Sequence, residues 1–108
     1  MPKPVVTTEQ AIVDIAEQAG FIAEDNPEAA ERYISAVRAA IASLGDKPTR
    51  GGPYKTGHPK LKGLRRLIVP RFTNYLIFYF NLTDKVRVIS VIHGARDIPS
   101  ILSEASYE

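Results

Sequence analysis

The chain has 108 residues, of which 44% are hydrophobic and 24% are charged, and its formal net charge is +2. This length and balance are typical of one globular domain, here residues 1–108, and they exclude a disordered chain. The lack of cysteine excludes disulfide frameworks and thiolate metal sites, and no apolar run approaches the ~20 residues of a membrane span. The apolar run at Val5-Val6 is too short for a signal-peptide core, so we expect a cytoplasmic protein with no membrane partner.

Two amphipathic helices are predicted in the N-terminal half. Thr7 and Gln10 have the spacing of a capping box, and a first helix is expected over about Thr8–Ala23. Its polar face, opposite the apolar one, carries Glu9, Asp14, Glu17 and Gln18. Asn26, before a proline, is a typical N-cap for a second helix that ends before Gly45. The short connection predicts an antiparallel helix hairpin.

Strands dominate the C-terminal half, after a loop rich in glycine, proline and lysine from Asp46 to Gly63. Runs of β-branched and aromatic residues predict three strands, at Leu64–Val69, Asn74–Phe80 and Lys85–His93, and Val5-Val6 could add a fourth. In the last strand, strict alternation would place Val86, Val88 and Ile92 on one face.

These elements predict an α+β fold, with a two-helix N-terminal hairpin packed on a three- to four-stranded antiparallel sheet. A short C-terminal helix follows, which Asp97 can cap. The middle strand is apolar on both faces, and its aromatic residues fit core packing better than a stacking platform for nucleic acid; they are Tyr75, Phe78, Tyr79 and Phe80. One helix pair can cover only one face of this sheet, so the C-terminal helix or a partner must cover the other.

Basic residues are concentrated between Lys47 and Arg71, and no Asp or Glu occurs between Asp46 and Asp84. The basic residues are Lys47, Arg50, Lys55, Lys60, Lys62, Arg65, Arg66 and Arg71. Such polarity favours an anionic partner, either nucleic acid or an acidic protein segment. The alternative interpretation is a solvated loop whose charges serve solubility.

With these elements placed, the sequence resembles the ParE branch of the RelE/ParE toxin superfamily. Four segments carry the resemblance: Ile22–Ala30, Leu64–Pro70, Tyr75–Tyr79 and Val88–Asp97, the last ending in His-Gly-Ala-Arg-Asp. The resemblance implies the toxin of a type II toxin–antitoxin pair, in a heteromeric complex with an antitoxin whose C-terminal segment wraps it as a helix or an added strand. ParE-like members are reported to poison DNA gyrase, whereas RelE-like members cleave mRNA on the ribosome.

A ribonuclease of this fold needs a general base, a general acid and cations that stabilise the phosphorane. The candidates for catalysis are Arg66, His93 and Arg96, and Tyr107 matches the C-terminal tyrosine of RelE-like enzymes only in location. His93 is alternatively a strand-end residue bonded to backbone, and Arg96 alternatively braces the turn beside Asp97. Arg65 and Arg66 occupy adjacent strand positions, so they should point to opposite faces.

The residues expected to contact the target or the antitoxin are Lys60, Lys62, Arg65, Arg66, Arg71, His93 and Arg96. No cofactor or metal is expected, because two distant histidines without cysteine do not make a convincing ligand set. We therefore predict a non-catalytic toxin that inhibits DNA gyrase. The alternatives are an mRNA endonuclease whose partners are the ribosome and mRNA, and a non-toxic module that only binds the antitoxin.

Overall fold

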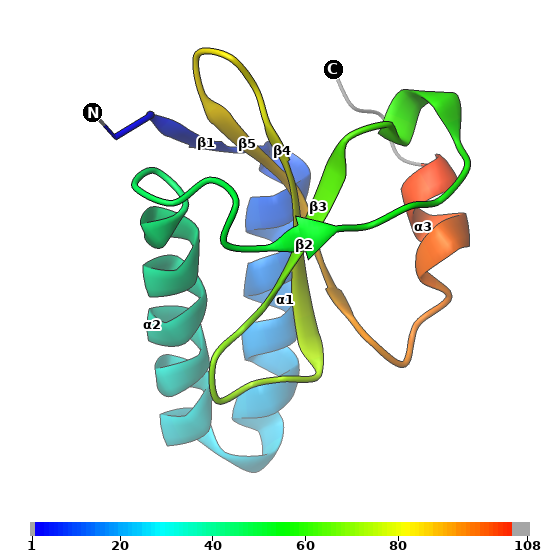
Figure 1. Cartoon of the computed structure of the whole chain (residues 1–108). Helices are drawn as coiled ribbons and strands as arrows, with labels where there is room; N and C mark the ends of the chain where they lie inside the picture. Colours follow the sequence, from blue (N-terminus) through cyan, green and yellow to red (C-terminus); the bar gives the residue numbers. More distant parts are fainter. Residues whose placement is uncertain (1, 105–108) are drawn as a thin grey trace.

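The structure, a computed structural model, describes residues 2–104 (Figure 1). The elements in chain order are β1 (Val5–Thr7), α1 (Glu9–Asp25), α2 (Pro27–Ser43), β2 (Gly52–Pro53), the 3-10 turn η1 (Pro59–Leu61), β3 (Leu64–Ile68), β4 (Tyr75–Asn81), β5 (Val86–His93) and α3 (Ile98–Glu104). The predicted α+β class, the helix hairpin and the short C-terminal helix are confirmed. Tyr107 lies outside the described residues.

Helix α1 begins one residue later than predicted, because Thr8 rather than Thr7 is its N-cap. The Thr8 hydroxyl accepts a hydrogen bond from the Ala11 amide at 3.3 Å, and it donates to the Ile89 carbonyl at 3.1 Å. The cap therefore also fixes the start of α1 to β5. The predicted capping box is wrong, since the Gln10 side chain donates to a carboxylate one turn further along the helix.

The turn between α1 and α2 rests on Asn26, as predicted. Its backbone N–H donates to the Ile22 carbonyl and ends α1, while its side chain accepts from the Ala29 amide at 3.1 Å and starts α2. At the other end of α2, Gly45 follows the C-cap, also as predicted. A Cβ at Gly45 would lie 2.7 Å from the Lys3 carbonyl, so glycine is required there for close approach of the N-terminal segment.

The sheet has five strands in the order β1-β5-β4-β3-β2, one more than the largest number predicted. It is mixed rather than wholly antiparallel, because β1 runs parallel to β5. β2, which the sequence assigned to the loop, is a two-residue strand that pairs Gly52 and Pro53 with β3. Two residues, as in β2, are too few to show the alternation by which a strand is predicted. The direction of β1 relative to β5 depends on how the chain returns through the two helices, which the sequence pattern does not show.

A β-bulge changes the faces of β5. Phe78 pairs with Ser90 and Tyr79 pairs with Val88, which leaves Ile89 as the extra residue. Val91 therefore packs in the same core as Val86, while Ile92 lies on the opposite face, contrary to the strict alternation expected. The bulge thus lets one strand supply apolar residues to both faces of the sheet.

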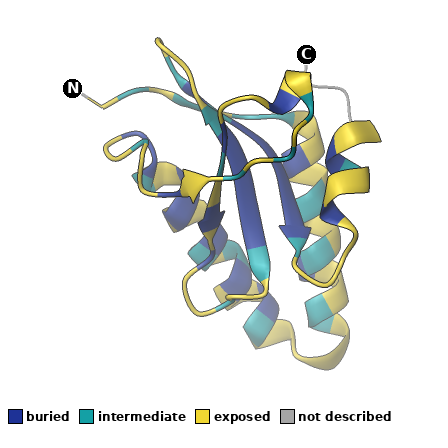
Figure 2. Cartoon of the chain, turned by 45° about the vertical axis from the view of Figure 1, so that its right-hand side comes forward, coloured by how far each residue is buried: buried dark blue, intermediate teal, exposed yellow. Residues whose placement is uncertain are grey.

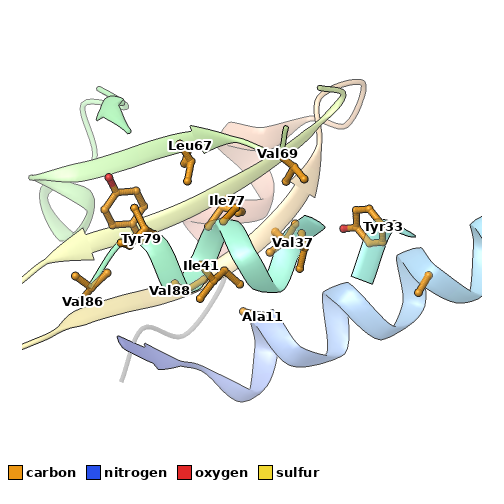
Figure 3. Close-up of a cluster of buried hydrophobic side chains, with 14 residues drawn as sticks. Ala11, Tyr33, Val37, Ile41, Leu67, Val69, Ile77, Tyr79, Val86 and Val88 are labelled. Atoms are coloured by element: carbon orange, nitrogen blue, oxygen red, sulfur yellow. The ribbon is translucent and has the colours of Figure 1, made fainter. Parts of the chain in front are cut away.

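Two apolar cores lie on the two faces of the sheet. The first core, under α1 and α2, is built around Tyr33, Val37, Ile41, Ile77 and Tyr79 (Figure 3). The second core lies under α3 and η1 and includes Leu61, Leu64, Phe78, Ile92, Ile98 and Leu102. Figure 2 shows the middle of the sheet buried between these layers. The C-terminal helix therefore covers much of the second face, one of the two possibilities that the sequence left open.

Candidate functional site

A groove of about 740 Å³ runs along the outer edge of β5 between α1 and α3. It exists because β1 pairs only with Val86–Val88, so beyond Val88 the edge of β5 that faces away from β4 has no strand beside it. The groove is lined by Asp14, Gln18 and Phe21 of α1, by Ser90–His93 of β5, and by Arg96, Ile101 and Leu102, among others. It brings together two of the predicted site residues, His93 and Arg96.

Side chains of α1 form hydrogen bonds with backbone groups at this open edge of β5. One Asp14 carboxylate oxygen accepts from the Ser90 hydroxyl at 2.7 Å and from the Val91 amide at 3.0 Å. The Gln18 amide donates to the Val91 carbonyl at 2.7 Å. These bonds pair groups that would otherwise form a template for an added strand.

A buried tyrosine extends this network to α2. The Tyr33 hydroxyl donates to the carbonyl oxygen of the Gln18 side chain. Burial raises the pKa of the Tyr33 phenol, and the nearby Tyr75 and Asp14 raise it further. The phenol therefore keeps its proton and remains a donor, which links α2 through α1 to the edge of β5.

His93 has a backbone partner, as one of the two sequence interpretations proposed. Its Nδ1 accepts from the Ala95 amide at 3.0 Å, and its ring meets that of Tyr75 edge to face at 5.0 Å. The Arg96 amide closes the turn by donating to the His93 carbonyl, while the Arg96 side chain is exposed. The Asp97 carboxylate accepts from the Ser100 hydroxyl at 2.8 Å, next to the start of α3.

Two of the three residues suggested for ribonuclease chemistry, Arg66 and His93, lie on opposite faces of the sheet. Arg66 is paired with Phe78, whose ring belongs to the second core. His93 is paired with Tyr75, which packs against the first core. Because directly paired residues share a face, the sheet separates Arg66 from His93.

The other predicted contact residues do not form one surface. Lys60 and Lys62 are exposed on the loop between β2 and β3, whereas Arg71 lies in the turn between β3 and β4, beside α2. The Arg65 guanidinium is engaged in the fold, since its Nε donates to the Gly51 carbonyl at 2.8 Å. The expected set is thus divided between the groove, the β2–β3 loop and the β3–β4 turn.

The polar residues of the groove floor were not among the predicted site residues. The sequence pattern placed Asp14 and Gln18 on a polar face opposite the apolar one, whereas both are half-buried and bond to β5. Their spacing of four residues shows that they share a side of α1, but only the packed structure shows which side. Ser90, 4% exposed, is the buried polar residue of the strand that meets them.

Within residues 2–104, no helix is both long and apolar enough to cross a membrane. In the same range, no three His, Asp or Glu side chains are grouped so that they could hold a metal ion.

Comparisons with known proteins agree with this fold. The model of the family described as "ParE toxin of type II toxin-antitoxin system, parDE" matches residues 5–98. A protein of Sinorhizobium fredii (strain NBRC 101917 / NGR234) that is named as a toxin, Y4kP, is 26% identical over 100 residues, which are 93% of this chain and 97% of that protein. A chain of the structure titled "Chromosomal ParDE TA system from P. aeruginosa" has the same fold, with a TM-score of 0.68 and 14% identity over 84% of this chain and 95% of that one. The chain therefore belongs to the ParE toxin family of type II toxin–antitoxin systems.

Proposed function

We propose that this toxin inhibits DNA gyrase by binding it, without catalysing a reaction. Membership of the ParE family supports gyrase as the target, since gyrase poisoning is reported for that branch. The observation that carries the non-catalytic part is the separation of Arg66 from His93 by the sheet. A general base and a phosphate-binding cation must approach the same phosphodiester, and Arg66 and His93 face different layers. Of the three candidates, this leaves Arg96 alone beside His93 in the groove. Gyrase acts in the cytoplasm, so we also place the toxin there.

We further propose that a cognate antitoxin binds in a heteromeric complex and covers the groove beside β5. The groove walls are apolar at Phe21 and Ile101, and Phe21 is 68% exposed. Exposed apolar side chains in the groove suit the apolar face of an amphipathic helix. An added strand is less suited, because Asp14 and Gln18 already pair with the backbone of Val91 at this edge. The groove also carries Asp14 and Glu17 near one wall, so the covering segment should offer basic groups there.

The test is a supercoiling assay with purified gyrase, relaxed plasmid and ATP, into which the toxin is titrated. We expect supercoiling to be lost at saturating toxin and to return when an equimolar amount of the antitoxin is added. Toxin that was mixed with antitoxin beforehand is the matched control and should leave gyrase active. Undisturbed supercoiling at saturating toxin contradicts the proposal.

The second candidate is a ribosome-dependent mRNA endonuclease, and the exposed cations Lys60, Lys62 and Arg66 favour it. A translating extract separates the two functions, because an endonuclease would cut the message and a gyrase inhibitor would leave it intact. Unimpaired growth on induction without antitoxin would contradict both functions and leave the antitoxin-binding module.

A further inference from the structure

The loop between β2 and β3, residues 54–63, is a surface feature that the groove does not use. Lys55, Lys60 and Lys62 are exposed on it, and His58 is half-buried. The chain has no acidic residue from 47 to 83, so no carboxylate of this segment neutralises the three ammonium groups. The loop surrounds a hollow of about 500 Å³.

The base of this loop is fixed to the sheet. The Tyr54 amide donates to the Leu64 carbonyl at 2.8 Å, and the Tyr54 ring meets the Phe78 ring edge to face at 5.0 Å. Near the other end, Leu61 is 2% exposed within the second core. The apolar side chains of the loop are therefore turned inward, and the lysines are left on the outside.

Turn hydrogen bonds shape the exposed part of the loop. The Thr56 hydroxyl accepts from the His58 amide at 3.0 Å, and His58 Nδ1 accepts from the Lys60 amide at 3.2 Å. Gly57 and Gly63 have φ of 78° and 87°, a left-handed conformation that glycine adopts without penalty. The three lysines thus project from a backbone of defined shape.

The charge around the loop is mostly positive. The Arg66 guanidinium lies 5.8 Å from the centre of the Tyr54 ring, a cation–π contact that adds a fourth cation at the base of the loop. The acidic residues of α1 and α2 occur between Glu9 and Glu31, and the α1–α2 turn lies at the opposite end of the molecule (Figure 1). Glu104 ends α3, which packs in the second core together with Leu61 of the loop. An anion approaching the loop therefore meets mostly positive charge.

We propose that residues 54–66 form a binding surface for the phosphodiester backbone of nucleic acid. A peptide partner would need exposed apolar anchors, and Tyr54 and Leu61 are packed against the second core. A nucleic-acid backbone is bound by cations that neutralise its phosphates and release their condensed counterions. The three lysines and Arg66 supply such cations. This surface lies outside the groove that we assign to the antitoxin, and the inference does not depend on gyrase being the target.

The experiment measures binding of the full chain to a short labelled duplex DNA and to a single-stranded RNA, across a range of salt concentrations. The variant combines Lys55→Gln, Lys60→Gln and Lys62→Gln. We expect its affinity at low salt to fall on the order of tenfold. The slope of log K against log salt should flatten by about 0.9 for each phosphate that a removed lysine had neutralised on the duplex, or by about 0.7 on the single strand. The nucleic acid that shows the loop-dependent slope identifies the source of the phosphates.

A matched control removes three exposed cations elsewhere, by Arg32→Gln, Arg38→Gln and Lys47→Gln. It should lose much less affinity than the loop variant, although its net charge is the same. Absent binding by the wild-type chain, equal losses of affinity in both variants, or equally tight binding of a poly-glutamate peptide of matched charge would each overturn the proposal. If the triple variant does not fold, the three single variants replace it. Each should flatten the slope of log K against log salt by about a third of the amount expected for the triple variant.

Discussion

Single residues decide how the open edge of β5 is closed. Tyr33, Gln18 and Asp14 are polar side chains taken into the interface between helix and sheet, and each has a partner. A buried polar group without a partner costs about 1–3 kcal/mol, so the members of this network depend on one another. These hydrogen bonds explain why polar residues occur on α1 and α2 where the helices pack on the sheet, among side chains that are mostly apolar.

Replacing Tyr33 by Phe should change how stability depends on pH. The unfolded phenol ionises near pH 10, whereas in the folded protein its pKa is raised by burial. Above about pH 10 the unfolded state therefore binds fewer protons than the folded state, and the free energy of unfolding falls as pH rises. In the Tyr33→Phe variant this contribution is absent, so its free energy of unfolding should fall less steeply as pH rises. At neutral pH the variant should be about 1 kcal/mol less stable than the wild type, because the hydrogen bond to Gln18 is missing.

Urea unfolding of both proteins from pH 7 to pH 11 makes the measurement. Below pH 9 the two curves of stability against pH should run parallel, which serves as the internal control. Curves that stay parallel through pH 11 would show that Tyr33 does not contribute to alkaline destabilisation.

Among the elements, α3 owes its position to packing rather than to helix propensity. It has seven residues, fewer than an isolated helix needs in water. Ile98 and Leu102 are buried in the second core, where Leu102 is fully inaccessible. The helix should therefore unfold together with the sheet that it covers.

Truncation of Leu102 tests this coupling. Leu102→Ala should lower the free energy of unfolding by about 3 kcal/mol, since it leaves a cavity beneath α3. Ser103→Ala, at the next and exposed position, should change stability by no more than about 0.5 kcal/mol. Both are measured by urea denaturation, and a loss below about 1 kcal/mol for Leu102→Ala would mean that α3 is not held against the sheet.

In the whole molecule, the sheet divides the predicted contact residues between separate surfaces. Arg66 belongs to the α3 side and His93 to the side of the helix hairpin. Residues that act in one catalytic step show strongly non-additive effects, whereas distant and independent contacts add. Whether the effects of changing Arg66 and His93 add therefore distinguishes a toxin that only binds its target from a nuclease.

A double-mutant cycle with Arg66→Ala and His93→Ala measures this distinction. We expect the effects on the toxin concentration for half-maximal gyrase inhibition to add within about 0.5 kcal/mol. The comparison cycle uses His93→Ala with Tyr75→Ala, whose rings are in contact, and it should show coupling in stability. Coupling of more than about 1 kcal/mol between Arg66 and His93 would indicate a shared site.

The sequence by itself determined the features that depend on local chemistry. Asn26 with its following proline predicts the helix corner, and runs of β-branched and aromatic residues predict β3, β4 and β5 to within a residue or two at each end. These signals lie within a few residues of one another, so no knowledge of the distant chain is needed. The same local motifs carried the resemblance to the ParE family, which the comparisons confirm.

Only the tertiary structure decided which distant groups meet. The parallel pairing of β1 with β5, the bulge at Ile89 and the inward side of Asp14 all follow from contacts between segments far apart in the chain. The division of Arg66 from His93 also depends on strand register, which a single strand cannot reveal. Local patterns specify the kind of element, whereas burial and pairing, which set the free energy of the packed molecule, specify which side chains form a site.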